Sequence, residues 1–226
     1  MSYAEGSAPR AAISLPWLTH THASLSGWRK VAKRVFDLLG ASVLFVLGLP
    51  VLVAAAILIR LSGSGPVFFV QRRVGYRCRS FNMVKLRTMV EGAQHHERSL
   101  HEQDRDRLFF KPRADPRVTA IGRFLRKYSI DELPQLLNVL RGDMSLVGPR
   151  PLLEVDLERF PRQEQMRRFS VKPGLTGLWQ VSGRSGLSDA QRLQLDLDYV
   201  DNWSQMLDCA ILVRTIPAVL SGQGAT

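Results

Sequence analysis

Cysteine is scarce in this chain of 226 residues: Cys78 and Cys209 are the only two, and they lie far apart without the spacing of a metal-binding pair. This scarcity argues against a disulfide framework and suits a reducing compartment. Acidic residues are also few, because 20 Asp and Glu face 31 Lys and Arg, which gives a net charge of +11. Such an excess favours an anionic partner: nucleic acid, anionic lipid headgroups or a phosphorylated substrate.

Long apolar runs are absent with one exception. Residues 1–27 contain only short, interrupted apolar stretches, which predict a flexible tail and not a signal peptide. Residues 38–59 carry no charge, and as a helix they would measure about 33 Å, enough to span the hydrocarbon core. The chain is otherwise ordinary in composition, with 45% hydrophobic and 23% charged residues, so a packed core is expected.

Two features complicate a simple membrane span. Pro50 lies near the middle of the run, where a proline typically costs ~3 kcal/mol or kinks the helix. Basic residues flank both ends, whereas a spanning helix concentrates positive charge on its cytoplasmic side. Three interpretations fit the residues: a re-entrant helix that breaks at Pro50 and returns to the same membrane face, a kinked transmembrane helix, and a buried core helix.

Two adjacent carboxylates, Asp131 and Glu132, stand where a helix is predicted to begin. Ser129 and Glu132 have the S-x-x-E spacing of a capping box. The unpaired N–H groups and the macrodipole at such an end favour ionised carboxylates and attract anions, phosphate above all. Basic residues lead up to the pair: Arg117, Arg123, Arg126 and Lys127. The pattern indicates a phosphoryl-transfer site, although acidic residues are also ordinary in the first turn of a helix.

The rest of the chain predicts a mixture of short strands and helices. Residues 67–70 and 81–86 read as two strands around a basic turn. The helix after the acidic pair is expected to end near Gly142. Apolar periodicity predicts further helices at 118–128, 189–200 and 206–220, of which the last could pack in the core or lie at a membrane surface.

Arg150 is the most constrained of the basic residues, because it stands between Pro149 and Pro151 in a predicted loop. A guanidinium held on such a restricted backbone suits bidentate phosphate binding. On spacing alone, a surface arginine in a turn is the commoner reading.

Several short motifs follow one another along most of the chain: KRVFD (33–37), KLRTM (85–89), SIDELPQ (129–135), NVLRGDMS (138–145), VGPRP (147–151) and KPGLTG (172–177). In this order they resemble the bacterial sugar transferase family, the small monotopic phosphoglycosyl transferases, from about Lys33 to Ile216. The length and the short N-terminal tail are similar to those of stand-alone members used in exopolysaccharide assembly.

The resemblance implies a reaction. Hexose-1-phosphate, of galactose or glucose, would move from a UDP-sugar to undecaprenyl phosphate with release of UMP, through a phosphosugar-aspartyl intermediate. By the motifs, Asp131 matches the nucleophile and Glu132 the ligand of the cofactor Mg²⁺. Substrate or phosphate binding is implied for the residues at the other matching positions: Lys85, Arg126, Arg150, Arg184 and Asp208. The family commonly carries Ser-Pro at its helix break, whereas this chain has Leu49-Pro50.

The expected fold class is α+β and mostly helical, in a monotopic membrane protein. We expect a flexible tail at 1–27, a re-entrant helix at 28–62 broken at Pro50, and a compact cytoplasmic catalytic domain at 63–226 with a small β-hairpin and interfacial helices. The expected location is the cytoplasmic face of the bacterial inner membrane, where soluble donor and buried lipid acceptor meet. The expected partners are the two substrates and the lipid bilayer, with a possible homo-oligomer and no nucleic acid.

An alternative of a different class is a basic, membrane-tethered nucleic-acid-binding or scaffold protein without turnover. It would show salt-sensitive binding and no catalysis. It leaves the Asp131–Glu132 pair and the rigid Arg150 loop unexplained.

Overall fold

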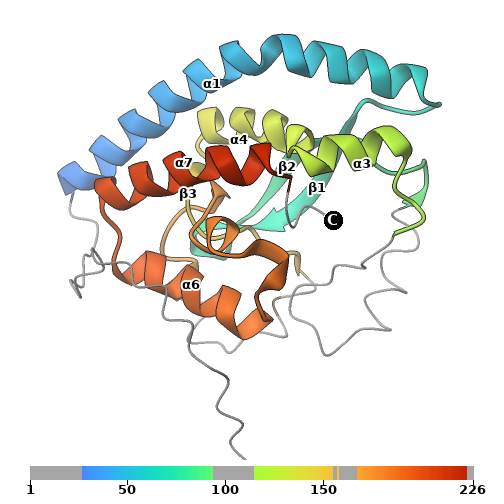
Figure 1. Ribbon diagram of the computed structural model, residues 1–226. Helices are drawn as coiled ribbons and strands as arrows, with labels where there is room; N and C mark the ends of the chain where they lie inside the picture. Colours follow the sequence, from blue (N-terminus) through green and yellow to red (C-terminus); the bar gives the residue numbers. More distant parts are fainter. Residues whose placement is uncertain (1–26, 94–114, 155–156, 158–166, 223–226) are drawn as a thin grey trace, which may run out of the picture.

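The computed structural model describes residues 27–93, 115–154, 157 and 167–222 (Figure 1). It confirms a mostly helical α+β fold with one long apolar helix near the N-terminus and a small β-hairpin. The predicted tail lies outside the described residues except for Gly27. The path of the long helix through a membrane stays a prediction.

Helix α1 spans Gly27–Leu61 and arches across one side of the molecule (Figure 1). It contains Pro50 and is assigned as one helix throughout, so the predicted break is not an interruption of the helix. Among the described residues, α1 is the helix that is long and apolar enough to cross a membrane, and most of its apolar stretch is not buried.

The KRVFD motif docks the beginning of α1 onto the rest of the chain. Arg34 donates to the carbonyls of Val139 and Leu140, at 2.6 and 2.9 Å, where the last carbonyls of a helix need donors. Asp37 is buried and accepts hydrogen bonds from the Ser145 hydroxyl at 2.9 Å and the Leu146 amide at 3.0 Å. The motif therefore has a structural use within the part of the chain that the structure describes.

The other end of α1 is anchored as well. Ile59 is buried in a cluster with Leu86 and Leu125, and its carbonyl accepts a hydrogen bond from Arg87 at 3.3 Å. Both ends of the apolar helix thus contact the same body of the protein.

The predicted hairpin is present and longer than expected. Strand β1, Phe68–Val74, pairs antiparallel with β2, Ser80–Leu86, through the short 3₁₀ helix η1, Tyr76–Cys78. Arg77 and Cys78 have positive φ values of 55° and 56°, which turns the chain tightly between the strands.

Helix α3, Ala120–Lys127, is followed by the 3₁₀ helix η3, Ile130–Gln135, and by α4, Leu136–Arg141. As predicted, α4 ends at Gly142. Its φ of 94° lies in the left-handed region that favours glycine, and its N–H donates to the Asn138 carbonyl.

A second, parallel pair of strands lies where the sequence predicts only loops. Strand β3, Ser145–Val147, pairs with β4, Gly174–Thr176. Three-residue strands are too short to show an alternating pattern. The backbones of the two segments approach closely where β3 ends. A Cβ on Gly174 would lie 2.1 Å from the Gly148 nitrogen.

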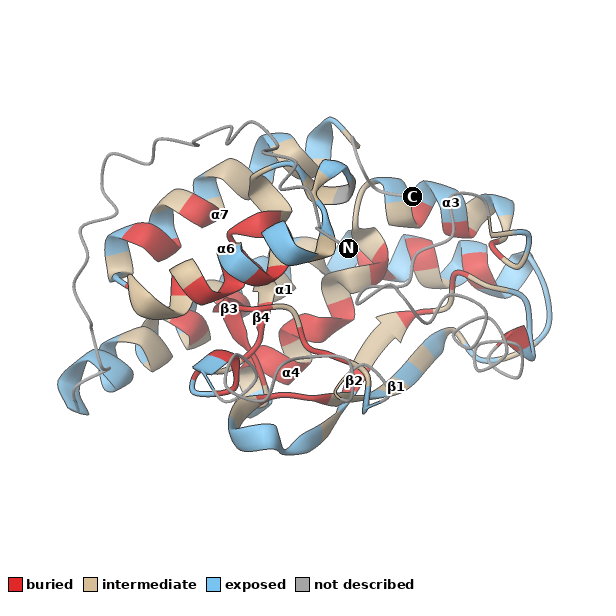
Figure 2. Ribbon diagram, turned by 90° about the horizontal axis from the view of Figure 1, so that it is seen from below, coloured by how far each residue is buried: buried red, intermediate tan, exposed pale blue. Residues whose placement is uncertain are grey.

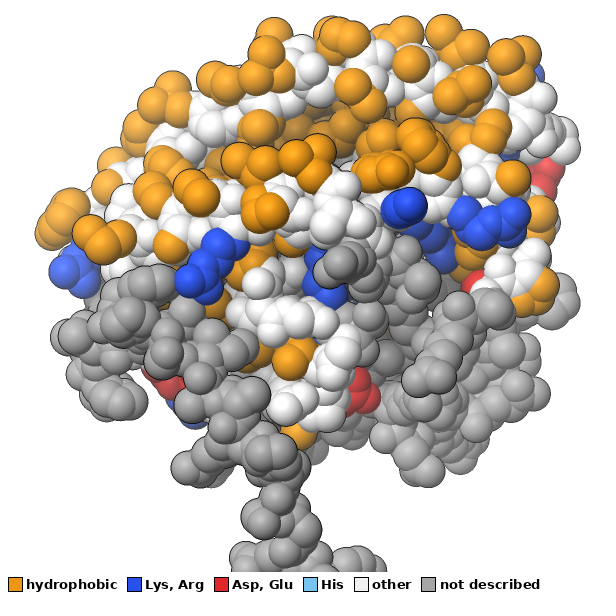
Figure 3. All heavy atoms as spheres, viewed as in Figure 1, with side chains coloured by type: hydrophobic (Ala, Val, Ile, Leu, Met, Phe, Trp, Pro, Cys, Tyr) orange, Lys and Arg blue, Asp and Glu red, His pale blue; other side chains and the backbone are white. Residues whose placement is uncertain are grey.

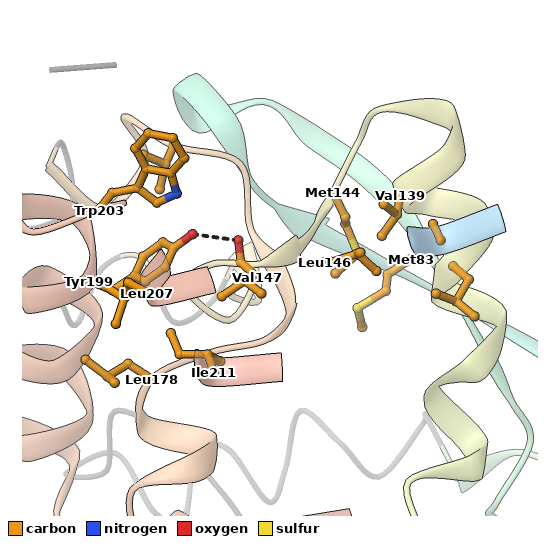
Figure 4. Close-up of a cluster of buried hydrophobic side chains, with 13 residues drawn as sticks. Met83, Val139, Met144, Leu146, Val147, Leu178, Tyr199, Trp203, Leu207 and Ile211 are labelled. Carbon is orange, nitrogen blue, oxygen red and sulfur yellow. Dashed lines mark hydrogen bonds between the residues drawn. The ribbon is translucent and has the colours of Figure 1, made fainter. Parts of the chain in front are cut away.

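After β4, the 3₁₀ helices η5, Trp179–Val181, and η6, Arg184–Gly186, lead into α6, Asp189–Asp201, and α7, Gln205–Leu220. Both predicted C-terminal helices are confirmed. Buried residues gather on β3, β4 and α4 (Figure 2). The largest core cluster joins these elements to α6 and α7 through residues that include Val139, Leu146, Leu178, Tyr199 and Leu207 (Figure 4).

Candidate active site

Three segments that are distant in sequence bring opposite charges together around Glu132. Lys85, near the end of β2, places its Nζ 3.5 Å from Glu132 Oε1. Arg150, in the loop after β3, places its Nη1 3.4 Å from the same oxygen. Glu132 itself lies in η3 with its side chain 17% exposed. One carboxylate is therefore shared by two cations in a partly shielded place.

Asn138 holds β2 in register with the acidic segment. Its Nδ2 donates to the Asn82 carbonyl at 2.7 Å, and its Oδ1 accepts from the Val84 amide at 3.1 Å. Because α4 directly follows η3, this pair of bonds fixes Lys85 relative to Glu132. Asn138 is fully buried, and its place in the NVLRGDMS motif is explained by this contact.

The predicted capping box is wrong. Ser129 has a φ of 54°, and its side chain makes no capping hydrogen bond. Its own N–H donates to the Arg126 carbonyl at 3.0 Å, so it is not available to the Glu132 side chain. Glu132 faces Lys85 and Arg150 instead. The element that follows is a 3₁₀ helix of six residues, so the nearby cations, and not a long helix dipole, supply the positive charge.

Asp131 is buried, with 8% of its surface exposed. Burial and the neighbouring charge of Glu132 raise the pKa of Asp131, while Lys85, Arg126 and Arg150 act in the opposite direction. The expectation that the helix end favours the ionised form is therefore corrected, because desolvation outweighs it. The three basic residues favour the anionic form of Asp131, which a nucleophilic carboxylate requires.

Lys85 and Glu132 lie beside Asp131, and both have shifted pKa values. Burial lowers the pKa of Lys85 to about 8, against the opposing effect of Glu132. For Glu132, burial acts to raise the pKa, but Arg150 and Lys85 outweigh it and hold the pKa below its ordinary value. The lowered pKa favours the ionised form of Glu132.

Arg126 belongs to the same electrostatic group from the side of α3. Its Nε donates to Thr88 Oγ1 at 2.9 Å, and the charges of Asp131 and Glu132 favour its protonated form. Burial, the largest influence, lowers its pKa. Thr88 was not singled out by sequence reasoning, although it lies in the KLRTM motif.

Arg184 lies in η6, within electrostatic range of Glu132 and Arg150. Its Nε donates to the Gln180 carbonyl at 3.1 Å, and Glu132 and Arg150 both influence its pKa, which burial lowers. The structure therefore brings six of the predicted site residues into one charged group: Lys85, Arg126, Asp131, Glu132, Arg150 and Arg184.

Asp208 stands in a different network. It is fully buried, and its carboxylate accepts from Lys33 Nζ at 2.7 Å, the Tyr199 hydroxyl at 2.8 Å and Trp203 Nε1 at 3.1 Å. The Tyr199 hydroxyl also contacts the Val147 carbonyl at 2.8 Å (Figure 4). These partners occupy the carboxylate within the core, which favours a structural role for Asp208 over substrate binding.

Gln135 is a further polar residue of the acidic segment that sequence reasoning missed. It is 3% exposed, and its Nε2 has no hydrogen-bond partner among the described residues. A buried donor without a partner costs free energy, so it is a candidate to bind an oxygen of a ligand.

The carboxylates of this site suit Mg²⁺ only if the substrate supplies the remaining ligands. The described residues contain no group of three or more His, Cys, Asp or Glu that could hold a metal ion. Mg²⁺ typically binds through one or two carboxylates plus substrate phosphates and water, and Glu132 offers one such carboxylate. The cation contacts of Glu132 with Lys85 and Arg150 within the described residues are both to Oε1.

The acidic segment lies against the middle of the apolar helix. Leu133 of η3 packs against the buried cluster that contains Leu52 and Ala55 of α1, and a Cβ on Gly48 would lie 3.7 Å from the Leu133 side chain. The outer side of α1 remains exposed and apolar, and hydrophobic side chains of α7 continue this surface, with Lys and Arg along its lower edge (Figure 3). Such a border of basic residues is typical of a membrane interface.

Comparisons with known proteins agree with the motifs. The bacterial sugar transferase family matches residues 28–222. Exopolysaccharide production protein ExoY of Rhizobium meliloti is 42% identical over 224 residues, which cover 97% of this chain and 99% of that protein. Undecaprenyl-phosphate galactose phosphotransferase of Salmonella typhimurium is 41% identical over 85% of this chain and 41% of its own length. UDP-glucose:undecaprenyl-phosphate glucose-1-phosphate transferase of Caulobacter vibrioides is 43% identical over 85% of this chain and 71% of its own length.

Proposed function

Because this chain belongs to the bacterial sugar transferase family, we propose that it transfers hexose-1-phosphate from a UDP-sugar to undecaprenyl phosphate and releases UMP. The names of the relatives in Salmonella and Caulobacter support the lipid acceptor, and ExoY supports a place in exopolysaccharide production. In that role the reaction would be the first membrane step of polysaccharide assembly.

The observation that carries the proposal is the grouping of Asp131 and Glu132 with Lys85, Arg126 and Arg150. A diphosphate ester carries negative charge that must be bound and stabilised while a phosphorus–oxygen bond breaks. Arginine and lysine side chains from three segments meet that need, and a carboxylate among them can act as nucleophile.

In the proposed first step, an Asp131 carboxylate oxygen attacks the sugar-bearing phosphorus. The bond from that phosphorus to the bridging oxygen breaks, UMP leaves with that oxygen, and a phosphosugar-aspartyl intermediate forms. In the second step, an oxygen of the lipid phosphate attacks the same phosphorus and releases Asp131. Splitting the transfer in two lets one site serve a soluble donor and a lipid acceptor in turn.

Lys85, Arg126, Arg150 and Arg184 are proposed to bind the phosphates of the two substrates. Glu132 is proposed to hold Mg²⁺, which would neutralise charge on the diphosphate when bound. Its depressed pKa suits this task, because a metal ligand must be ionised.

The protein is membrane-associated, and we propose that α1 is re-entrant, with both ends and the catalytic domain on the cytoplasmic face of the inner membrane. As a helix of 35 residues, α1 would measure about 52 Å if straight. Its anchorage through Arg34 at one end and Ile59 at the other supports a helix that lies against the domain. The contact of Leu133 with α1 would hold the acidic pair close to the bilayer surface.

The proposal is tested by UMP release from purified protein in nanodiscs that contain undecaprenyl phosphate and magnesium. UDP-galactose and UDP-glucose are the expected donors, with UDP-N-acetylated sugars as the comparison. Release of UMP that requires the lipid phosphate supports the proposal. No UMP release with any donor, together with salt-sensitive binding to nucleic acid, would support the non-catalytic alternative.

A further inference from the structure

We propose that Arg168 and Asp196 are positioning residues that fix the backbone of Arg150 and so aim its guanidinium at the acidic pair. This inference rests on the proposed function, because Arg150 matters only if the site binds phosphate.

The contacts form a buried chain. Arg168 Nη2 lies 2.7 Å from Asp196 Oδ2 on α6, and the two side chains are each 1% exposed. The same Nη2 donates a short hydrogen bond to the carbonyl oxygen of Arg150. The Arg150 side chain then reaches Glu132, at 3.4 Å from Nη1 to Oε1. A residue of α6 is therefore connected to the acidic segment through the Arg168 guanidinium, the Arg150 carbonyl and the Arg150 side chain.

The loop around Arg150 is held at three consecutive carbonyls. The Pro149 carbonyl accepts from the Gly174 amide at 2.9 Å, and the Pro151 carbonyl accepts from Arg73 Nη1 at 3.4 Å. The Arg150 carbonyl, between them, accepts from Arg168. Pro149 and Pro151 restrict some backbone torsions of the loop, and the hydrogen bonds to its carbonyls restrict the others.

Burying an ion pair carries a desolvation cost that apolar side chains of the same volume do not have. Replacing such a pair by apolar residues of similar volume is often neutral or stabilising, so packing alone does not explain Arg168 and Asp196. The pair does provide a donor of fixed direction at the base of the Arg150 loop. A displacement of about 1 Å in a group that positions substrate can cost on the order of 100-fold in rate, which gives this fixing a catalytic consequence.

The experiment is a double-mutant cycle between Arg168→Met and Arg150→Met, with UMP release and thermal unfolding measured for all four proteins. We expect Arg168→Met to lower kcat/KM by about tenfold or more in the wild-type background. In the Arg150→Met background it should change kcat/KM by less than about twofold, because the side chain it positions is gone. Its effect on the unfolding temperature should be the same in both backgrounds.

Arg167→Met is the matched control. Arg167 is the neighbouring residue and pairs with Asp201 at the surface. Its replacement should leave kcat/KM within about twofold of the wild type.

Equal losses of kcat/KM in both backgrounds would overturn the positioning role while leaving the proposed function intact. If Arg168→Met does not fold, Arg168→Lys, which keeps the charge, enters the same cycle. Loss of folding in both variants would assign the ion pair to stability alone. Absence of UMP release by the wild-type protein would instead refute the proposed function.

Discussion

Lys33 Nζ lies 2.7 Å from Asp208 Oδ2, and this ion pair joins the beginning of α1 to α7. Lys33 also donates to the Val147 carbonyl at 3.2 Å, so one ammonium connects the apolar helix, β3 and the last helix. Its side chain is 11% exposed and that of Asp208 is fully buried. The arrangement links the long apolar helix to the core that supports the acidic site.

Asp208→Asn is expected to lower stability and leave donor binding unchanged. Breaking a buried ion pair by removing one charge costs about 3 kcal/mol, since the partner ammonium remains in the core. Thermal unfolding of the detergent-solubilised protein measures the loss, and the KM for UDP-sugar measures binding. A KM raised several-fold with an unchanged unfolding temperature would instead support the substrate-binding role predicted from the sequence.

Asp131→Asn is expected to lower turnover by on the order of 10⁴-fold or more, because the amide keeps the shape of the side chain but is not a nucleophile. UMP release and trapping of labelled phosphosugar on the protein are the measurements. Asp201→Asn, a change in an acidic residue that pairs with the surface residue Arg167, is the control and should retain activity. Trapping of label on the Asp131→Asn protein would place the intermediate elsewhere.

Glu132→Gln is expected to raise the magnesium concentration for half-maximal activity by about tenfold or more, together with loss of most activity. The neutral amide is a poorer ligand and also leaves Lys85 and Arg150 without their shared anion. The measurement is a magnesium titration of UMP release. Glu154→Gln, whose carboxylate is half-exposed and pairs with Arg72, is the control, and a titration midpoint of Glu132→Gln equal to that of the control would argue against a metal ligand.

Much of the fold was predictable because its signals are local. Alternation marked the hairpin, and apolar periodicity marked α3, α6 and α7. Gly142 marked the end of α4, where a positive φ is required. The adjacent carboxylates Asp131 and Glu132 were visible for the same reason: two functional groups stand side by side in the chain.

What the sequence did not reveal depends on contacts between distant segments. Thr88 and Arg126 are 38 residues apart, and the contact of Arg168 with Arg150 crosses 18. No local pattern indicates either contact. Ser129 has the sequence spacing of a helix N-cap, but its φ is positive and its side chain makes no capping hydrogen bond. The raised pKa of Asp131 likewise follows from burial, which tertiary packing creates.

The stability of the protein should depend on pH through Asp196. Burial raises the pKa of its carboxyl to about 6, although Arg168 opposes the rise. Between pH 3.8, the ordinary value, and about pH 6, the folded state therefore binds more protons than the unfolded state, so the free energy of unfolding falls as pH rises through this window. Two pKa units correspond to about 3 kcal/mol.

Thermal unfolding at pH 4.5 to 7 measures this dependence, with Asp196→Asn as the comparison. The amide does not titrate, so the stability of the wild type relative to the variant should decrease as pH rises and level off above about pH 6. A difference that stays constant over the whole range would mean that Asp196 titrates near its ordinary value.

The re-entrant path of α1 predicts that both of its ends face the cytoplasm. The test places Gly27→Cys at the first residue of α1 and Ser64→Cys just after its end, in a protein whose two exposed native cysteines are replaced by serine. A membrane-impermeant maleimide should label both positions in inverted vesicles and neither in intact spheroplasts, because each end of α1 is anchored to the same domain. A spanning helix would place one of the two cysteines outside, and labelling from opposite sides would overturn the re-entrant path.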